Sequence, residues 1–192
     1  MEQIVRGHWW MVACSGLYLV WWCVFFAPDA AGQKPSPTGA LRVAGVACIL
    51  GAVACGLLAV TSMVQGMAGM TGEAVPGLWI NAGCVALYVV LLAVTVRLFD
   101  RPVTTELLLF CAWCALELNV ASKVAVGSTA GAGAAGGGAA VLLVVLTLAT
   151  LAACTVCYTL YYRLDYVASF WDGCVPLALV GVVSAVVALV LG

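Results

Sequence analysis

The chain has 192 residues, of which 66% are hydrophobic and only 8% are charged, and its formal net charge is −1. Soluble domains average about 25% charged residues and about half apolar residues or fewer. This composition therefore excludes a water-soluble protein and predicts one that is embedded in the lipid bilayer. The near-zero net charge and the lack of a basic face exclude nucleic acid as an expected partner.

Six long apolar segments predict an all-α integral membrane protein, a bundle of about six transmembrane helices that forms a single polytopic domain over residues 1–192. A crossing needs about 20 mostly apolar residues at 1.5 Å per residue, and no segment shows the alternating polarity of a transmembrane β-strand. The expected spans are Trp9–Ala27, Arg42–Val64, Leu78–Phe99, Pro102–Ser122, Ala139–Tyr162 and Gly173–Leu191.

The basic residues predict the orientation of these spans. Five of them lie in or beside the connections after the first, third and fifth spans: Lys34, Arg42, Arg97, Arg101 and Arg163. Only Arg6 and Lys123 lie on the side that carries both termini. Positively charged connections are enriched on the cytoplasmic side, so we expect both termini outside. Abundant Ala, Val and Gly indicate a prokaryotic protein of the cell (cytoplasmic) membrane.

The first four spans show a weak internal repeat at an offset of 70 residues. If it is real, the first two spans and the next two are equivalent hairpins, and the bundle consists of three helical hairpins. The seven residues Gly7, Trp9, Cys14, Leu17, Tyr18, Val20 and Val24 match Gly77, Trp79, Cys84, Leu87, Tyr88, Val90 and Val94.

Small residues recur four apart in the second span, at Ala44, Cys48, Ala52 and Gly56. Such stripes let helix backbones approach closely in lipid. The stripe fits either the interface of a homo-oligomer or, in the interpretation we favour, a helix packed at the centre of one monomer.

The fourth span carries the strongest functional candidates. Glu106 and Glu117 are eleven residues apart, which at 100° per residue leaves them about 20° apart around the helix axis. The expected binding or pathway residues are Glu106, Phe110, Trp113, Glu117 and Asn119. A carboxylate within the hydrocarbon usually faces a cavity or a partner. The alternative is that Glu106 pairs with Arg97 or Arg101, and that Glu117 reaches the interface near Lys123.

A second group of charged residues is expected together at the cytoplasmic face, among several tyrosines and tryptophans. Its members are Arg97, Asp100, Arg101, Arg163, Asp165 and Asp172. These charges either fix the ends of the helices or form a surface on which a partner docks.

Other features predict little chemistry of their own. The Gly- and Ala-rich segment 123–138 is expected to be a flexible linker. The pairs Cys111/Cys114 and Cys154/Cys157 lie inside spans, where residues three apart share a face and Cys acts as a small hydrophobe. The single histidine, His8, precedes the first expected span and excludes a site with several histidines. We expect neither a metal nor a cofactor, and we expect no catalytic residues.

Transport of a small solute or ion is the function that the fourth span favours, by a carrier or by the membrane subunit of a transporter. With no nucleotide-binding motif, ATP-driven transport would need a separate ATPase or membrane subunit as partner. The alternatives are a structural or regulatory membrane subunit that docks a partner protein and, third, a membrane-embedded enzyme.

Overall fold

The computed structural model describes residues 1–34, 36–99, 105–129 and 134–192, and all regular structure in these ranges is helical. Six helices there are long and apolar enough to span a membrane, which confirms the predicted fold class. They are α1 (Glu2–Phe26), α2 (Gly39–Ala68), α3 (Gly77–Phe99), α4 (Thr105–Thr129), α5 (Ala134–Tyr161) and α6 (Tyr166–Leu191). Helices suit lipid because they satisfy every backbone polar group internally.

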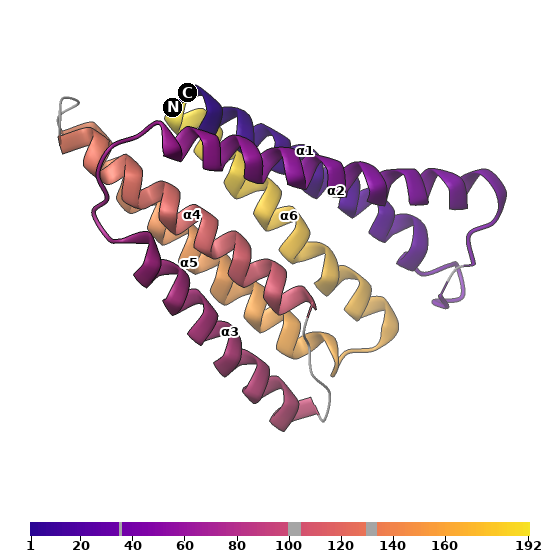
Figure 1. Ribbon diagram of the computed structural model, residues 1–192. Helices are drawn as coiled ribbons and strands as arrows, with labels where there is room; N and C mark the ends of the chain where they lie inside the picture. Colours follow the sequence, from indigo (N-terminus) through magenta and orange to yellow (C-terminus); the bar gives the residue numbers. More distant parts are fainter. Residues whose placement is uncertain (35, 100–104, 130–133) are drawn as a thin grey trace.

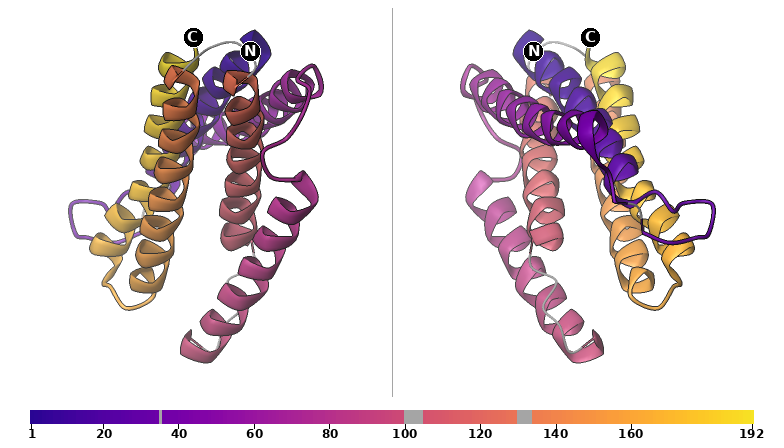
Figure 2. Two further views of the ribbon diagram at one scale, coloured as in Figure 1. Left: turned by 90° about the vertical axis from the view of Figure 1, so that its left-hand side faces the viewer. Right: turned by 90° about the vertical axis from the view of Figure 1, so that its right-hand side faces the viewer.

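The helices form two groups that meet where α5 packs against α6. In the first group, α1 packs against both α2 and α6. In the second, α4 packs against both α3 and α5, and α3 lies at the edge of the molecule (Figure 1, Figure 2). The helices also pair as antiparallel hairpins of consecutive elements, α1 with α2, α3 with α4 and α5 with α6.

Both termini lie at one end of the bundle (Figure 1). A Cβ atom placed on Gly192 would lie 3.5 Å from a methyl group of Val5, so the last residue is adjacent to the start of α1. At the opposite end, the Tyr166 hydroxyl donates a hydrogen bond of 2.7 Å to the carbonyl of Phe26. The helices α1 and α6 thus run antiparallel along their whole length.

Two helices begin seven residues earlier than the sequence predicts. The first starts at Glu2 rather than Trp9, and Glu2 and Arg6 form an exposed ion pair one turn apart at 3.8 Å. The sixth starts at Tyr166 rather than Gly173, because the Asp165 carboxylate caps it by accepting the Ala168 N–H at 2.8 Å. Hydropathy detects only the apolar part of a helix. Turns that contain charged residues at the start of a helix are therefore left out of the expected span.

The prediction of a flexible linker over residues 123–138 is wrong for most of that segment. Helix α4 continues to Thr129 and α5 starts at Ala134, while residues 130–133 lie outside the described ranges. Alanine has the highest helix propensity of all residues. It therefore extends both helices into a segment whose glycine content suggested a coil.

The second helix is not at the centre of the bundle, which corrects the interpretation favoured from its small residues. It packs mainly along α1, and only a minor part of its surface is buried. Its close approaches are to that neighbour: a Cβ atom on Gly45 would lie 2.5 Å from the Phe25 ring, and one on Gly66 would lie 2.6 Å from Ile4.

The internal repeat stays a prediction. Trp9 and Trp79 are both exposed, in line with equivalent positions. However, Gly7 is buried against α2, whereas Gly77 is half-buried beside Asn119 of α4.

Candidate functional site

A fully buried histidine–glutamate pair is the main polar feature inside the bundle. His8 Nε2 of α1 lies 3.0 Å from Glu117 Oε2 of α4, and both side chains have zero exposure. Although α1 and α4 are not among the helix pairs that pack extensively, these two side chains join them. The pair therefore connects the two groups of helices through their interior.

The hydrogen bonds of His8 determine how many protons the pair holds. Nδ1 lies 2.8 Å from the carbonyl oxygen of Ile4, and a carbonyl can only accept, so Nδ1 carries a hydrogen. A neutral imidazole then has only a lone pair at Nε2, and Glu117 must be protonated to donate to it. A charged imidazolium instead donates to a carboxylate. In both cases a single proton lies between Nε2 and Oε2, and the pair has no net charge.

Loss of that proton would leave the Nε2 lone pair facing a carboxylate, with one uncompensated negative charge in the interior. Such a charge is strongly unfavourable in a medium of low dielectric constant. The contact between α1 and α4 thus depends on whether a proton is bound. The arrangement can therefore couple the binding of a proton to the contact between two helices.

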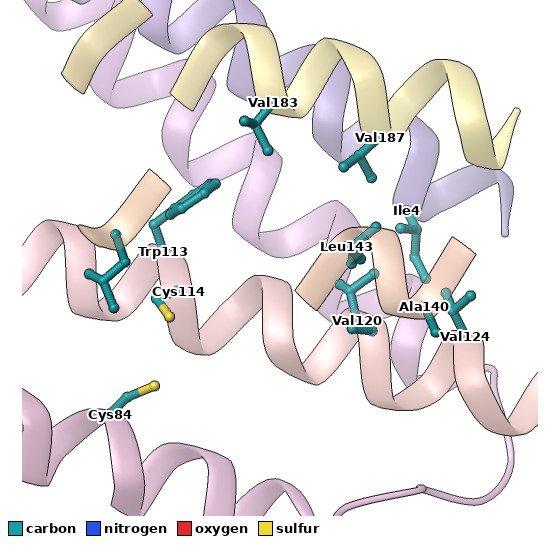
Figure 3. Packing of buried hydrophobic residues seen from close by; sticks show 12 residues of the cluster. Ile4, Cys84, Trp113, Cys114, Val120, Val124, Ala140, Leu143, Val183 and Val187 are labelled. Carbon is teal, nitrogen blue, oxygen red and sulfur yellow. The ribbon is translucent and has the colours of Figure 1, made fainter. Parts of the chain in front are cut away.

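Further buried polar groups surround the pair. Among the described side chains, Glu117 Oε1, Trp113 Nε1 and Ser184 Oγ are buried atoms without a hydrogen-bond partner. Trp113 lies one turn before Glu117 on the same face of α4, and its ring is directed toward α6, where Val183 points back (Figure 3). Buried polar atoms of this kind bind ordered water or polar groups of a ligand.

Ser184 and Thr147 lie near the depth of the pair. In the antiparallel contact of α1 with α6, the Ser15 hydroxyl donates to the carbonyl of Leu177, which places Ser184 within about one turn of His8. Thr147 of α5 is 1% exposed and donates to the Leu143 carbonyl at 2.8 Å. We call His8, Trp113, Glu117, Thr147 and Ser184 the polar layer.

Apolar side chains close the polar layer on the side of the termini. Five buried residues meet there, from α1, α4, α5 and α6 (Figure 3): Ile4, Val120, Val124, Leu143 and Val187. Ile4 has zero exposure, and Leu143 has 1%. Water reaching the pair from this end would have to pass a packed hydrocarbon cluster, so this end of the interior is sealed.

The structure divides the residues predicted on the fourth span. Trp113 and Glu117 belong to the polar layer, and Phe110 packs against the buried core. Asn119 instead faces α3, where its side-chain N–H group donates to Asn81 Oδ1 at 3.0 Å. It therefore does not join Glu117, from which it is turned by about 200° around the helix. The side chain of Glu106 lies outside the described part of the chain.

The alternative in which Glu117 reaches Lys123 at the interface is wrong. Lys123 Nζ lies 3.0 Å from Glu73 Oε1 in the connection between α2 and α3, and it also donates to the Gly72 carbonyl at 3.0 Å. Glu73 in addition accepts the Gly77 N–H at 2.9 Å. The Gly77 N–H and the nearby ammonium of Lys123 lower the pKa of Glu73 below its ordinary value.

The predicted charge cluster is not a single group in the described residues. Arg97 is exposed on α3, which makes no extensive contact with α6. Arg163 lies in the turn between α5 and α6, where Asp165 caps α6. Asp172 lies within α6, with a buried Oδ2 that has no partner. Asp100 and Arg101 lie outside the described ranges.

Metal ligands are not gathered in the described residues: no three His, Cys, Asp or Glu side chains there are placed to hold a metal ion. The ten cysteines are all free thiols. Cys84 of α3 and Cys114 of α4 face each other (Figure 3), beside a small apolar cavity that is also lined by Asn81, Tyr88 and Cys111.

His8 is the residue of the candidate site that the sequence analysis missed. Its position one residue before the apolar run placed it outside the expected span. Two signals point to it: it is the only histidine of the chain, and a carboxylate in the middle of a span needs a partner within reach. The helix that begins at Glu2 brings it inside.

Comparisons with protein-family models, with curated proteins and with solved structures find no match to this chain.

Proposed function

We propose that this protein moves a small solute or ion across a membrane, alone or as the membrane subunit of a transporter, and that proton binding at His8 and Glu117 drives the movement. The observation that carries the proposal is the fully buried pair, which holds one proton and joins two groups of helices. Ionisable residues inside a membrane bundle commonly form proton relays.

The mechanism follows from the proton count. With the proton bound, Nε2 and Oε2 attract each other and hold α1 against α4. Without it, the lone pair of the imidazole repels the carboxylate, and the arrangement in which the two helices separate becomes favoured. A ligand or proton shifts a conformational equilibrium only by its differential affinity for the two states. Here that difference is the single hydrogen bond between α1 and α4.

Two features support a transport role over a purely structural one. The unpartnered Glu117 Oε1 and Trp113 Nε1 give the interior an acceptor and a donor beyond those that the fold itself uses. By contrast, Asp165 of the predicted docking surface already has a structural role, because its carboxylate caps α6.

The test uses proteoliposomes that contain a pH-sensitive dye. A proton gradient is imposed in the presence of Na⁺, tetraphenylphosphonium, glycine or succinate in turn. We expect one of these probes to move together with protons, and Glu117→Gln to reduce that flux by at least about 100-fold. The variant Glu2→Gln is the matched control, because Glu2 is exposed on the surface of α1.

A wild-type protein that moves none of the probes faster than protein-free liposomes would contradict the proposal. So would a flux that is the same with and without the gradient, or the same in Glu117→Gln. A partner protein that co-purifies in stoichiometric amounts and dissociates in Arg163→Ala, with flux unchanged, would favour the docking subunit instead.

A further inference from the structure

A second carboxyl group lies half-buried in the bundle, at Asp172 near the start of α6. Its Oδ2 atom is buried and has no hydrogen-bond partner, and the thiol of Cys157 on α5 is within hydrogen-bonding reach of the carboxyl group. Asp165, two turns earlier, is exposed and caps the helix. Asp165 therefore has a structural role as the cap of α6, whereas Asp172 keeps a buried carboxyl oxygen without a partner.

The backbone at Asp172 also has spare hydrogen-bonding capacity. Pro176 lies four residues further along the same helix, and proline has no N–H to donate to the carbonyl of residue i−4. Interrupted hydrogen bonding inside a membrane helix is tolerated where it lines a polar or hydrated region. At Asp172, the carboxyl oxygen Oδ2 therefore has no hydrogen-bond partner, and the backbone carbonyl lacks its usual helical donor.

A stripe of small polar side chains connects Asp172 with the polar layer. Thr147, Thr150, Cys154 and Cys157 are spaced three or four residues apart, so they share one face of α5. The first three are between 1% and 4% exposed. Ten residues separate the first from the last, which corresponds to about 15 Å along the axis. One end of this stripe lies at the depth of Glu117, and the other end contacts Asp172.

We propose that Asp172 is a second proton-binding site, which exchanges protons with the His8–Glu117 pair along this face of α5. The proposal rests on the proposed function and extends it, since it names the route by which the proton enters. The cluster of Ile4, Val120, Val124, Leu143 and Val187 seals the end near the termini. The proton therefore arrives from the opposite end, where Asp172 lies.

The groups around Asp172 fit a proton better than a metal cation. The titratable group that faces it from α5 is the Cys157 thiol. On the α1 side, the Trp22 indole N–H donates to the Phe170 carbonyl at 3.2 Å, and Cys23 lies against Cys174 of α6. One carboxyl group with a neighbouring thiol is far short of the about six oxygen ligands that hard cations require.

The transfer conserves charge and atoms. The proton leaves the Asp172 carboxyl O–H, whose electron pair stays on the carboxylate. Water carries it past the hydroxyl groups of Thr150 and Thr147, each of which can both donate and accept a hydrogen bond. Once the pair has released its own proton, the arriving proton occupies the position between His8 Nε2 and Glu117 Oε2. A proton from the aqueous phase restores the carboxyl group of Asp172.

Infrared spectroscopy of the protein in lipid tests the site directly, because only protonated carboxyl groups show the carboxylic C=O stretch. We expect a band of this kind that titrates with pH, that is absent in Asp172→Asn and that is retained in Asp165→Asn. The second variant is the matched control, since asparagine also caps helices. A spectrum in which every titrating carboxylic band is unchanged in Asp172→Asn would overturn the proposal.

The proteoliposome flux assay tests the exchange between the two sites. We expect Asp172→Asn to reduce proton-coupled flux by about 100-fold, with unchanged membrane abundance and circular dichroism. If Glu117→Gln abolishes flux while Asp172→Asn does not, the proposed function stands and the second site is wrong. If the wild type shows no flux, the proposed function fails, and the infrared band alone decides whether Asp172 binds a proton.

The route between the sites has its own variant. Thr150→Val removes one hydroxyl group from the stripe at nearly constant volume. We expect it to slow the flux by about tenfold, the factor that corresponds to about 1.4 kcal/mol in the barrier. Thr61→Val is the control, because Thr61 is exposed on α2 and donates to its own helix. Equal fluxes in the two variants would exclude this face of α5 as the route.

Discussion

The helices α4 and α3 have similar lengths and are both apolar enough to span a membrane, but they occupy opposite environments. Half of the α4 span is buried inside the protein, compared with 11% of the α3 span. Helix α4 carries Glu117, which is paired within the core. The polar contact of α3 with α4 lies instead at the exposed pair Asn81 and Asn119. The same kind of membrane helix therefore serves as the centre in one case and as the edge in the other.

The difference shows where polar chemistry can be placed in a lipid-embedded protein. An ionisable side chain on α3 would face hydrocarbon for most of the length of that helix, which is strongly unfavourable. On α4 it can face α1, α5 and α6 instead. If this comparison is right, substitutions in the polar layer will have much larger effects than equivalent substitutions along α3.

The largest effect is expected from breaking the His8–Glu117 pair. Glu117→Ala leaves the imidazole buried without its partner, so we expect a loss of about 3 kcal/mol in the free energy of unfolding. Unfolding in detergent, followed by circular dichroism, measures it. The double variant His8→Leu with Glu117→Leu should recover most of this loss, because an apolar pair needs no proton. A double variant as unstable as the single one would contradict this account.

The next largest effect is expected from one added methyl group, which compares the tight contact between α1 and α2 with the open surface of α3. A Cβ atom on Gly7 would lie 2.5 Å from the Met63 side chain and 3.0 Å from the Ala59 carbonyl oxygen. We therefore expect Gly7→Ala to destabilise the protein by about 1–3 kcal/mol. Gly83 of α3 has no atom within 4 Å of the same position, so Gly83→Ala should be neutral or slightly stabilising. Thermal unfolding of both variants in one detergent compares them, and equal losses would contradict the assignment of α3 to the edge.

A smaller effect is expected for the polar contact between α3 and α4. Asn81→Ala removes the acceptor at Oδ1, while Asn119 keeps its second bond to the Ala115 carbonyl at 2.7 Å. Hydrogen bonds between membrane helices average about 0.6 kcal/mol, and we expect a loss of this size by the same unfolding measurement. A loss as large as that of Glu117→Ala would mean that α3 is not peripheral.

The smallest effect concerns acidification at the connection that leads into α3. Because the pKa of Glu73 is lowered in the folded protein, its carboxylate stabilises the fold above the unfolded pKa. That contribution is lost as the pH falls through the lower, folded pKa. Melting temperatures of the wild type and Glu73→Gln should therefore converge in acid and differ slightly near neutrality. A difference that grows in acid would have the wrong sign.

The sequence alone determined that this protein is embedded in the lipid bilayer, that it is all-helical and that it has about six spans. It also singled out Glu117, because a carboxylate within an apolar run usually faces protein or a cavity rather than lipid, and Trp113, because it lies on the same face of the helix. These conclusions depend on composition and on helical periodicity, which are local properties. For the same reason, the ends of the helices were predicted poorly: hydropathy does not register the polar turns at Glu2 or the capping carboxylate of Asp165.

The tertiary structure alone decided which partner each polar residue meets. His8 and Glu117 are separated by 109 positions in the chain, and Glu117 has Lys123 only six residues away as a competing partner. Only the packing of the helices shows that Lys123 turns outward to Glu73, while Glu117 points inward to α1. Periodicity fixes the face of a helix on which a side chain lies, but the neighbour of that face is set by contacts between distant segments.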